Sequence, residues 1–81
     1  MDPIREGMTG SMVEDAQDRL ASLDYEIDET ERSASEFGSS TANAVARFRI
    51  EHGLSISAEV DLPCWSVLVD ECYQMGDRTL Y

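Results

Sequence analysis

The chain has 81 residues, and its 17 acidic side chains outnumber six arginines, with no lysine, so the formal net charge is −11. That charge argues against nucleic acid and against anionic membrane surfaces as partners, because both attract basic proteins. The length allows one small domain, and 42% of hydrophobic residues is enough for a modest core. No apolar run approaches the ~20 residues of a membrane-spanning helix, and residues 1–6 do not resemble a secretion signal.

A first helix is predicted over residues 12–23. Its apolar residues recur at spacings of three and four, which places them on one helix face: Val13, Ala16, Leu20 and Leu23. Ser11 is a suitable N-cap, and Glu14, three positions later, would complete a capping box. The sequence therefore predicts an amphipathic helix that begins after Ser11.

The segment from residue 24 to residue 36 is polar and acidic. Its residues 30–35 have no apolar periodicity, which predicts an exposed, mobile loop. Alternating acidic residues resemble the first ligands of an EF-hand calcium loop: Asp24, Glu26 and Asp28. However, Glu29 stands where that loop needs glycine and Ser35 where it needs glutamate, so we expect no calcium site.

A second helix is predicted to begin at Ser39 or Ser40, either of which is a suitable N-cap. Its buried stripe follows the helical spacing: Thr41, Ala44, Val45 and Phe48. The opposite face is expected to point to solvent: Arg47, Arg49 and Glu51. Gly53 supplies the left-handed residue that ends the helix. His52 lies in the last turn, where its protonated form interacts favourably with the helix dipole.

A third helix is predicted from its N-cap, Asp61, to Gly76, with Pro63 in the first turn, where a missing N–H group is tolerated. Its apolar residues again follow the helical spacing: Trp65, Leu68, Val69 and Cys72. Three amphipathic helices must bury their stripes against each other, so the predicted fold is all-α, a small three-helix bundle. The domain is predicted to span residues 1–76, with residues 77–81 forming a linker to a downstream region.

The sequence offers no combination of residues typical of an enzyme. No acidic pair has the apolar surroundings that raise a carboxyl pKa for acid–base catalysis. Cys64 and Cys72 would lie about 12 Å apart along one helix, too far for a disulfide, and with the single His52 they do not form a zinc site. Cys72 is expected to be a small buried residue, whereas the position of Cys64 at a helix start can lower a thiol pKa. We therefore predict no catalytic residue, no metal and no cofactor.

Several motifs resemble the type-1 peptidoglycan-binding domain found beside bacterial cell-wall hydrolases. The central match runs from Phe37 to Arg49 and follows the family pattern F-G-x-x-T-x-x-A-V-x-x-F-Q, with Arg49 at the last position. Shorter matches lie at residues 4–10, 13–25, 53–54 and 60–68. More narrowly, residues 73–81 resemble the connector between tandem copies in actinobacterial N-acetylmuramoyl-L-alanine amidases, in which two such domains precede a zinc amidase domain. This chain resembles the first copy.

The resemblance implies a non-catalytic module that binds peptidoglycan, through a muropeptide stem, and targets a cell-wall N-acetylmuramoyl-L-alanine amidase to its substrate. It also implies a place in the cell envelope, or secretion with the parent enzyme, although this sequence carries no signal. Free amides at the start of the second helix would suit the carboxylate of a peptide stem. The candidate ligand-binding residues are Phe37, Gly38, Ser39, Ser40, Thr41, Asn43 and Trp65.

Departures from the family pattern leave a second interpretation open. Ser35 and Glu36 replace the Asp-Gly pair that precedes the Phe-Gly pair in the family. Other replacements affect the family's glycine and threonine positions: Asp24, Ala58 and Cys64. The hydroxyls at the helix start could serve only as caps, and Trp65 could belong only to the core. The chain would then be a protein-interaction or regulatory module that keeps the fold without the ligand, with the acidic segment 24–36 contacting a basic partner.

Overall fold

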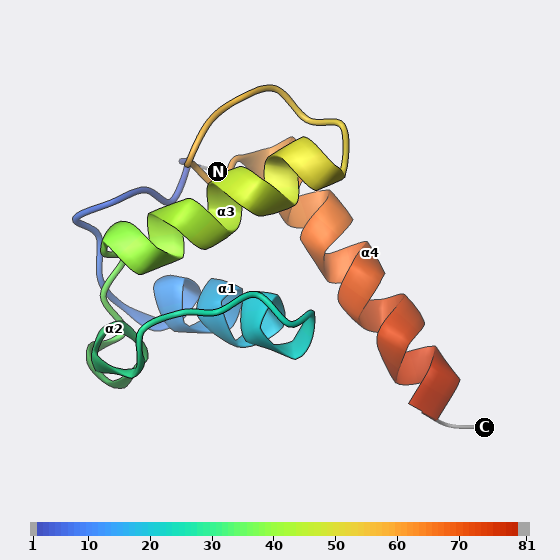
Figure 1. Cartoon of the computed structure of the whole chain (residues 1–81), viewed down its shortest axis with the longest axis horizontal. Helices are drawn as coiled ribbons and strands as arrows, with labels where there is room; N and C mark the ends of the chain where they lie inside the picture. Colours follow the sequence, from blue (N-terminus) through green and yellow to red (C-terminus); the bar gives the residue numbers. More distant parts are fainter. Residues whose placement is uncertain (1, 80–81) are drawn as a thin grey trace.

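The structure, a computed structural model, describes the backbone of residues 2–79 and the side chains of residues 2–73. It contains four helices: α1 (Ser11–Ser22), α2 (Glu29–Ala34), α3 (Ser39–Glu51) and α4 (Leu62–Thr79) (Figure 1). The described residues form no β-strand, only isolated bridges between Ile4 and Val60 and between Thr9 and Glu36. The all-α class and the small helical bundle are confirmed, with four helices instead of the three predicted.

The three long helices enclose one hydrophobic core. α1 and α3 lie side by side, and α4 packs against α1 before its C-terminal half extends away from the rest of the molecule (Figure 1). The core residues come from all three helices and from the segments before them: Ile4, Val13, Ala16, Leu20, Phe37, Ala42, Ala44, Val45, Phe48, Val60, Cys64 and Leu68. Each large side chain buried here contributes roughly 1.5–3 kcal/mol. The predicted stripes therefore meet in one interior. The prediction that Cys72 is buried is wrong, because Cys72 is only half-buried and the cysteine in the core is Cys64.

The first helix agrees with its predicted range to within one residue at each end, but its predicted capping box is wrong. Ser11 is already helical, and the N-cap is Gly10, which has a φ of 121° and provides no side-chain cap. The backbone N–H of Gly10 donates to the carbonyl of Ser35 (3.2 Å), which holds the chain in a conformation that glycine tolerates. The Glu14 carboxylate accepts a hydrogen bond from the Ser35 hydroxyl (3.3 Å) instead of capping α1.

Helix α2 occupies the segment predicted to be a mobile loop. Its N-cap is Asp28, whose carboxylate accepts a hydrogen bond from the N–H of Thr30 (3.0 Å). It ends at Ser35, which has a left-handed φ of 50°. None of its six residues is buried, so it has no apolar stripe for a periodicity search to find. A helix this short is unstable alone in water, so its order depends on polar contacts with α1 and α3.

Helix α3 begins and ends at glycines. Its N-cap is Gly38, without a side-chain cap hydrogen bond, so the prediction that Ser39 or Ser40 caps this helix is wrong. The predicted end is confirmed, because Gly53 has a left-handed φ of 73°. His52 is the C-cap residue, and its Nδ1 lies 2.9 Å from the carbonyl oxygen of Phe48.

Arg49, predicted to point to solvent, is only 2% exposed. Its guanidinium donates to the carbonyl (2.9 Å) and hydroxyl (3.0 Å) of Ser55, to the carbonyl of Glu59 (3.0 Å) and to the carboxylate of Asp61 (2.9 Å). Burial disfavours the charge, but the hydrogen bond and the negative charge of Asp61, together with Cys64, outweigh it and raise the pKa of Arg49. The same hydrogen bond lowers the pKa of Asp61. Arg49 therefore holds the connection between α3 and α4 in place, whereas Arg47 and Glu51 are exposed as predicted.

Helix α4 starts as predicted but continues further than expected. The Asp61 carboxylate accepts a hydrogen bond from the N–H of Cys64 (3.1 Å), and Pro63 lies in the first turn. The helix passes Gly76 and ends at Thr79, since one glycine costs only about 1 kcal/mol inside a helix and does not stop it alone. The predicted start of a linker at residue 77 falls inside this helix and stays a prediction, and residues 80–81 lie outside the described part of the chain.

Candidate ligand-binding site

The start of α3 is the centre of the predicted site, and a side chain of α2 occupies it. The Glu31 carboxylate accepts hydrogen bonds from the backbone N–H groups of Gly38 (3.0 Å), Ser40 (3.1 Å) and Thr41 (3.0 Å). It also accepts one from the Thr41 hydroxyl (2.8 Å). The amides that the sequence suggested were free for a ligand carboxylate are therefore bonded to a carboxylate of the chain itself.

This environment favours the ionised form of Glu31. Partial burial disfavours the charge, but the hydrogen bonds from Ser40 and Thr41 outweigh it and lower the pKa of Glu31 to about 2. The carboxylate lies so close to Gly38 that a Cβ atom there would be 2.6 Å from Cδ of Glu31 and 2.9 Å from each of its oxygens. A side chain at position 38 would therefore displace the Glu31 carboxylate from its present position.

Gln17 supports this arrangement from inside the core. It is 1% exposed, and its Nε2 donates to the carbonyl of Glu36 (2.8 Å) and to the hydroxyl of Thr41 (3.1 Å). Gln17, Thr41 and Glu31 thus form a continuous hydrogen-bond chain from α1 to α2 across the start of α3. Among the described buried side chains, Oε1 of Gln17 is the polar atom without a hydrogen-bond partner.

The candidate residues at the start of α3 differ in accessibility. Phe37 and Thr41 are both 0% exposed, so they shape this region from beneath. Gly38 and Ser40 are half-buried, and the Ser40 hydroxyl accepts a hydrogen bond from the N–H of Asp28 (2.9 Å). The exposed candidates are Ser39 and Asn43.

Trp65 belongs to another part of the molecule. It lies on α4, half-buried against the core, and the guanidinium carbon of Arg19 is 5.8 Å from its ring centroid. Figure 1 shows α2 and the start of α3 at the opposite end of the molecule from α4. The structure therefore brings six of the seven candidate residues together and separates Trp65 from them.

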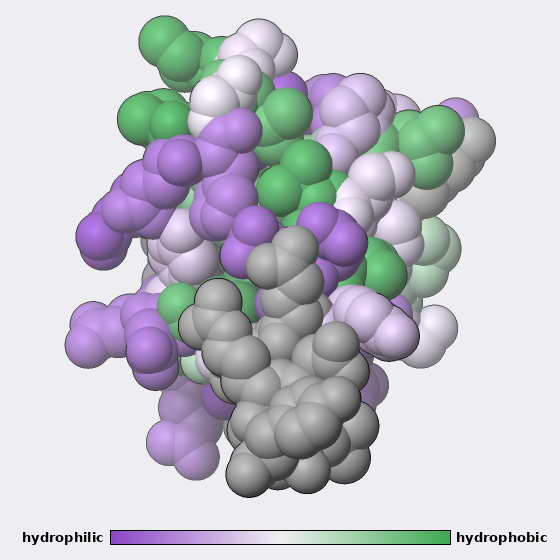
Figure 2. Space-filling model, turned by 90° about the vertical axis from the view of Figure 1, so that its right-hand side faces the viewer, coloured by the Kyte–Doolittle hydropathy of each residue, from purple (hydrophilic) through white to green (hydrophobic). Residues whose placement is uncertain are grey.

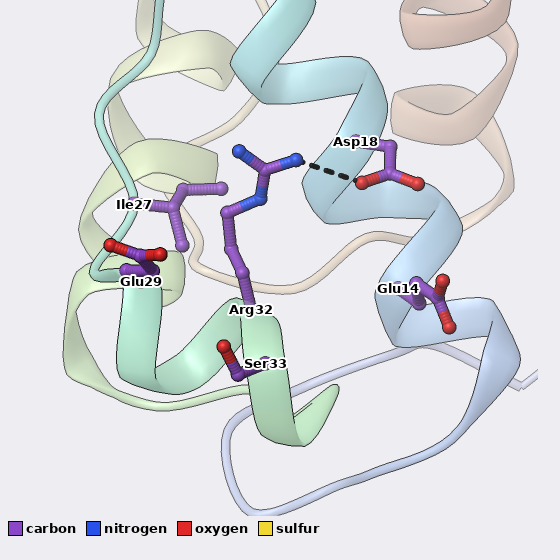
Figure 3. Close-up of a pocket in the computed structure, with 6 residues that line it drawn as sticks. All are labelled: Glu14, Asp18, Ile27, Glu29, Arg32 and Ser33. Carbon is purple, nitrogen blue, oxygen red and sulfur yellow. Dashed lines mark hydrogen bonds and ion pairs between the residues drawn. The ribbon is translucent and has the colours of Figure 1, made fainter.

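A depression of about 500 Å³ lies between α1 and α2. Figure 3 shows Arg32 reaching from α2 toward Asp18 of α1, and the two side chains form an ion pair at 3.0 Å. The other lining residues are polar or acidic apart from one aliphatic side chain: Glu14, Ile27, Glu29 and Ser33. This surface is mainly acidic, with one arginine already paired.

Exposed apolar residues lie elsewhere. Figure 2 shows hydrophobic side chains at the top of the molecule, over the connection between α3 and α4. The exposed large hydrophobic residues of that region are Ile50, Ile56 and Leu62. A second depression of about 500 Å³, next to the start of α1, is bordered by the exposed Met8 and Met12.

The Cys64 thiol and the Tyr25 phenol both have raised pKa values. Burial raises the pKa of the Cys64 thiol, which is 1% exposed, so the lowered pKa considered for this position is wrong. Burial and a hydrogen bond to Glu51 raise the pKa of Tyr25 to about 12. Within the described part of the chain, no three His, Cys, Asp or Glu side chains are grouped so that they could hold a metal ion.

Three long helices around one core, with the short α2 and a polar network at the start of α3, define a small all-α domain. Residues 9–68 match the family model described as "Putative peptidoglycan binding domain". Because this match covers most of the sequence, the chain belongs to that family of peptidoglycan-binding domains, which are non-catalytic.

One solved structure gives a close comparison. The chain is similar to a peptidoglycan-binding protein from Clostridioides difficile, solved in complex with glutamine hydroxamate, with 36% sequence identity and a TM-score of 0.74. The match covers 83% of this chain and 40% of the other, so this chain spans less than half the length of that protein. A search of the curated proteins finds no match. No helix among the described residues is both long enough and apolar enough to cross a membrane.

Proposed function

We propose that this domain is a non-catalytic module that binds the muropeptide stem of peptidoglycan and targets a cell-wall N-acetylmuramoyl-L-alanine amidase to its substrate. The observation that carries the proposal is the family match over residues 9–68. The structural similarity to a peptidoglycan-binding protein supports it. The module would act in the cell envelope, or be secreted with its parent enzyme.

The contact surface follows from what Glu31 leaves available. Since Glu31 occupies the amides at the start of α3, the first contacts with a stem fall to the exposed hydroxyl of Ser39 and the exposed amide of Asn43. Both groups can donate and accept hydrogen bonds, as a peptide backbone requires. The half-buried Ser40 lies between them in sequence.

Cosedimentation with insoluble peptidoglycan tests this proposal. The wild-type chain should pellet with the polymer, and the Ser39→Ala/Asn43→Ala double variant should bind about tenfold more weakly, given about 0.5–1.5 kcal/mol for each hydrogen bond lost. Ser66→Ala, an exposed serine on α4, is the matched control and should bind like the wild type. A wild-type chain that stays in the supernatant would overturn the proposal.

Targeting of an amidase needs its own experiment. Fusing the chain to an amidase catalytic domain should raise the rate on insoluble peptidoglycan without changing the rate on a soluble muropeptide, because binding raises the local concentration of the enzyme on the polymer. An equal effect on both substrates, or none on either, would reject the targeting role.

The structure also favours one specific alternative, a protein-interaction or regulatory module. Its support is the Glu31 carboxylate, which already occupies the anion-binding amides, and the acidic surface shared by α1 and α2. Such a module would bind a basic protein partner, and the affinity would fall as salt is added. Reversing charge at Glu14 and Glu29 should abolish that binding without affecting cosedimentation with peptidoglycan.

A further inference from the structure

We propose that His52 is a pH-sensitive attachment between α3 and α4, which holds the outer half of α4 through Glu71 when the imidazole is protonated and releases it when the imidazole is neutral. His52 is the C-cap residue of α3, and its Nε2 lies 3.8 Å from Oε1 of Glu71 on α4. Histidine is the residue type that ordinarily changes charge between pH 5 and 8, and this chain has one. The switch would therefore operate between mildly acidic and neutral pH.

The contact of His52 with its own helix determines which nitrogen of the neutral ring carries the proton. Nδ1 lies 2.9 Å from the carbonyl oxygen of Phe48, and a carbonyl oxygen can only accept a hydrogen bond. We therefore assign the proton of the neutral ring to Nδ1, which leaves Nε2 as an acceptor. The ring is also held by stacking on Phe48, with the ring centroids 4.2 Å apart.

In this tautomer the neutral ring has no donor for Glu71. The separation of 3.8 Å between Nε2 and the carboxylate is longer than a hydrogen bond, as expected for a nitrogen without a proton beside a carboxylate. A proton added at Nε2 turns the same contact into an ion pair and supplies a donor to Glu71. The carbonyl groups at the end of α3 also interact favourably with the charged ring. Protonation thus creates an attraction between α3 and α4 that the neutral ring lacks.

The groups around His52 leave the change of charge in this pH range to its imidazole. Tyr25 packs edge-on against Phe48, and its hydroxyl donates a hydrogen bond to the Glu51 carboxylate. Burial and this hydrogen bond raise the pKa of Tyr25 to about 12, so Tyr25 stays neutral between pH 5 and 8. Carboxyl groups ordinarily titrate below pH 5, and arginine stays charged. The titratable and charged groups of this region are Tyr25 before α2, Arg47 and Glu51 on α3, and Asp70 and Glu71 on α4.

The position of Glu71 gives this contact an effect on the outer half of α4. The inner half is anchored by Cys64 and Leu68, which are buried in the core. The outer half extends away from the rest of the molecule (Figure 1) and is attached by polar groups, among them Cys72, whose Sγ donates to the carbonyl of Arg19 (3.6 Å). Local opening of this half would break the contact between Glu71 and His52 and leave Cys64 and Leu68 in place. The strength of that contact therefore affects how often the outer half opens.

Amide hydrogen exchange of the 81-residue chain tests the switch. Protection factors of residues 70–73, corrected for the intrinsic exchange rate, are measured by NMR at pH 5.5 and 7.5 and at low, constant ionic strength, where screening is weak. In the wild type they should be about two- to fivefold higher at pH 5.5, the effect of a partly exposed ion pair. Glu71→Gln should lose this pH dependence. Glu29→Gln, at an exposed position of α2, removes the same charge at the other end of the molecule and should behave like the wild type.

The tautomer of His52 provides a second test, in the wild type alone. At pH 8.5 the nitrogen and carbon chemical shifts of the ring should show the proton on Nδ1. A neutral ring with its proton on Nε2 would overturn the proposal, because that ring could donate to Glu71 at any pH. Protection factors of the wild type that do not change with pH, or that change equally in Glu71→Gln, would also overturn it. If Glu71→Gln does not fold, the two measurements on the wild type decide.

Discussion

Three polar side chains of this domain, Gln17, Thr41 and Arg49, are almost completely buried. Each connects segments that hydrophobic packing alone would leave free to shift. Gln17 and Thr41 join α1 to α3 and, through Glu31, to α2. Arg49 joins α3 to the connection that leads into α4. In a domain this small the apolar core is modest, so these polar contacts determine how the loops lie.

Replacing Arg49 with methionine should destabilise the domain by about 2–3 kcal/mol, because it leaves the carbonyls of Ser55 and Glu59 and the Asp61 carboxylate without their donor. Urea unfolding followed by circular dichroism measures this change. Arg47→Met, at an exposed position of the same helix, is the control and should change the free energy of unfolding by less than about 0.5 kcal/mol. Equal effects of the two substitutions would show that the buried network is not needed.

The stabilising effect of Glu31 should depend on pH. Its pKa is lowered from 4.5 to about 2 in the folded chain, so the ionised carboxylate stabilises the fold above pH 4.5, and the contribution is lost as the pH falls toward 2. At pH 7, Glu31→Gln should lower the free energy of unfolding by about 1–3 kcal/mol. Measured at pH 7, 5, 4 and 3, the difference from the wild type should stay constant to about pH 5 and then shrink. A difference that does not vary with pH would contradict the assigned role.

At the scale of elements, α2 and α3 depend on each other. Helix α3 has no cap of its own, since Gly38 provides no side chain, and the Glu31 carboxylate supplies the missing acceptor. Helix α2 has no buried residue and is held by that same carboxylate. Each helix would be weaker without this contact, so the two should be disrupted together.

A double-mutant cycle measures this dependence. Gly38→Ala should destabilise the wild type by about 1–2 kcal/mol, because the new Cβ atom displaces the Glu31 carboxylate, which lies within 2.6 Å of it. In a Glu31→Ala background the same substitution should have little effect. The coupling is expected to be on the order of 1 kcal/mol. Additive effects of the two substitutions would mean that Gly38 and Glu31 act independently.

The three long helices could be predicted from the sequence because each has an apolar stripe with helical spacing. Helix α2 could not be predicted that way, since a helix without buried residues leaves no stripe. A different signal was present: Asp28 followed three residues later by Glu31 has the spacing of a capping box. In the structure Asp28 caps α2, whereas Glu31 turns to α3.

The site was only partly predictable because its main contact comes from a different helix. The spacing of the Phe-Gly motif located the start of α3, but no local pattern indicates that a carboxylate seven residues earlier fills it. Arg49 follows Val45 by four residues, so its spacing placed it on the buried face. It was misplaced because a charged residue usually faces water, and its hydrogen-bond partners lie in an irregular connection. Gln17 follows Val13 by four residues and precedes Leu20 by three, so its helical spacing did indicate burial.

At the scale of the whole molecule, a net charge of −11 surrounds one compact core, from which the end of α4 extends. The charge disfavours long-range attraction to anionic polymers, so the proposed contact with a peptidoglycan stem would depend on local hydrogen bonds. A single small contact of this kind gives weak binding, which a second module on the same chain would strengthen through effective concentration.

Titration of the isotope-labelled chain with a soluble muropeptide, followed by NMR, tests peptidoglycan recognition most directly. At millimolar muropeptide, the account predicts saturable shifts at the backbone and side chain of Asn43 and at Ser39, with Ser66 on α4 unchanged. Absence of any shift between Phe37 and Asn43 at that concentration, or shifts confined to other parts of the chain, would contradict the claim that the start of α3 contacts peptidoglycan.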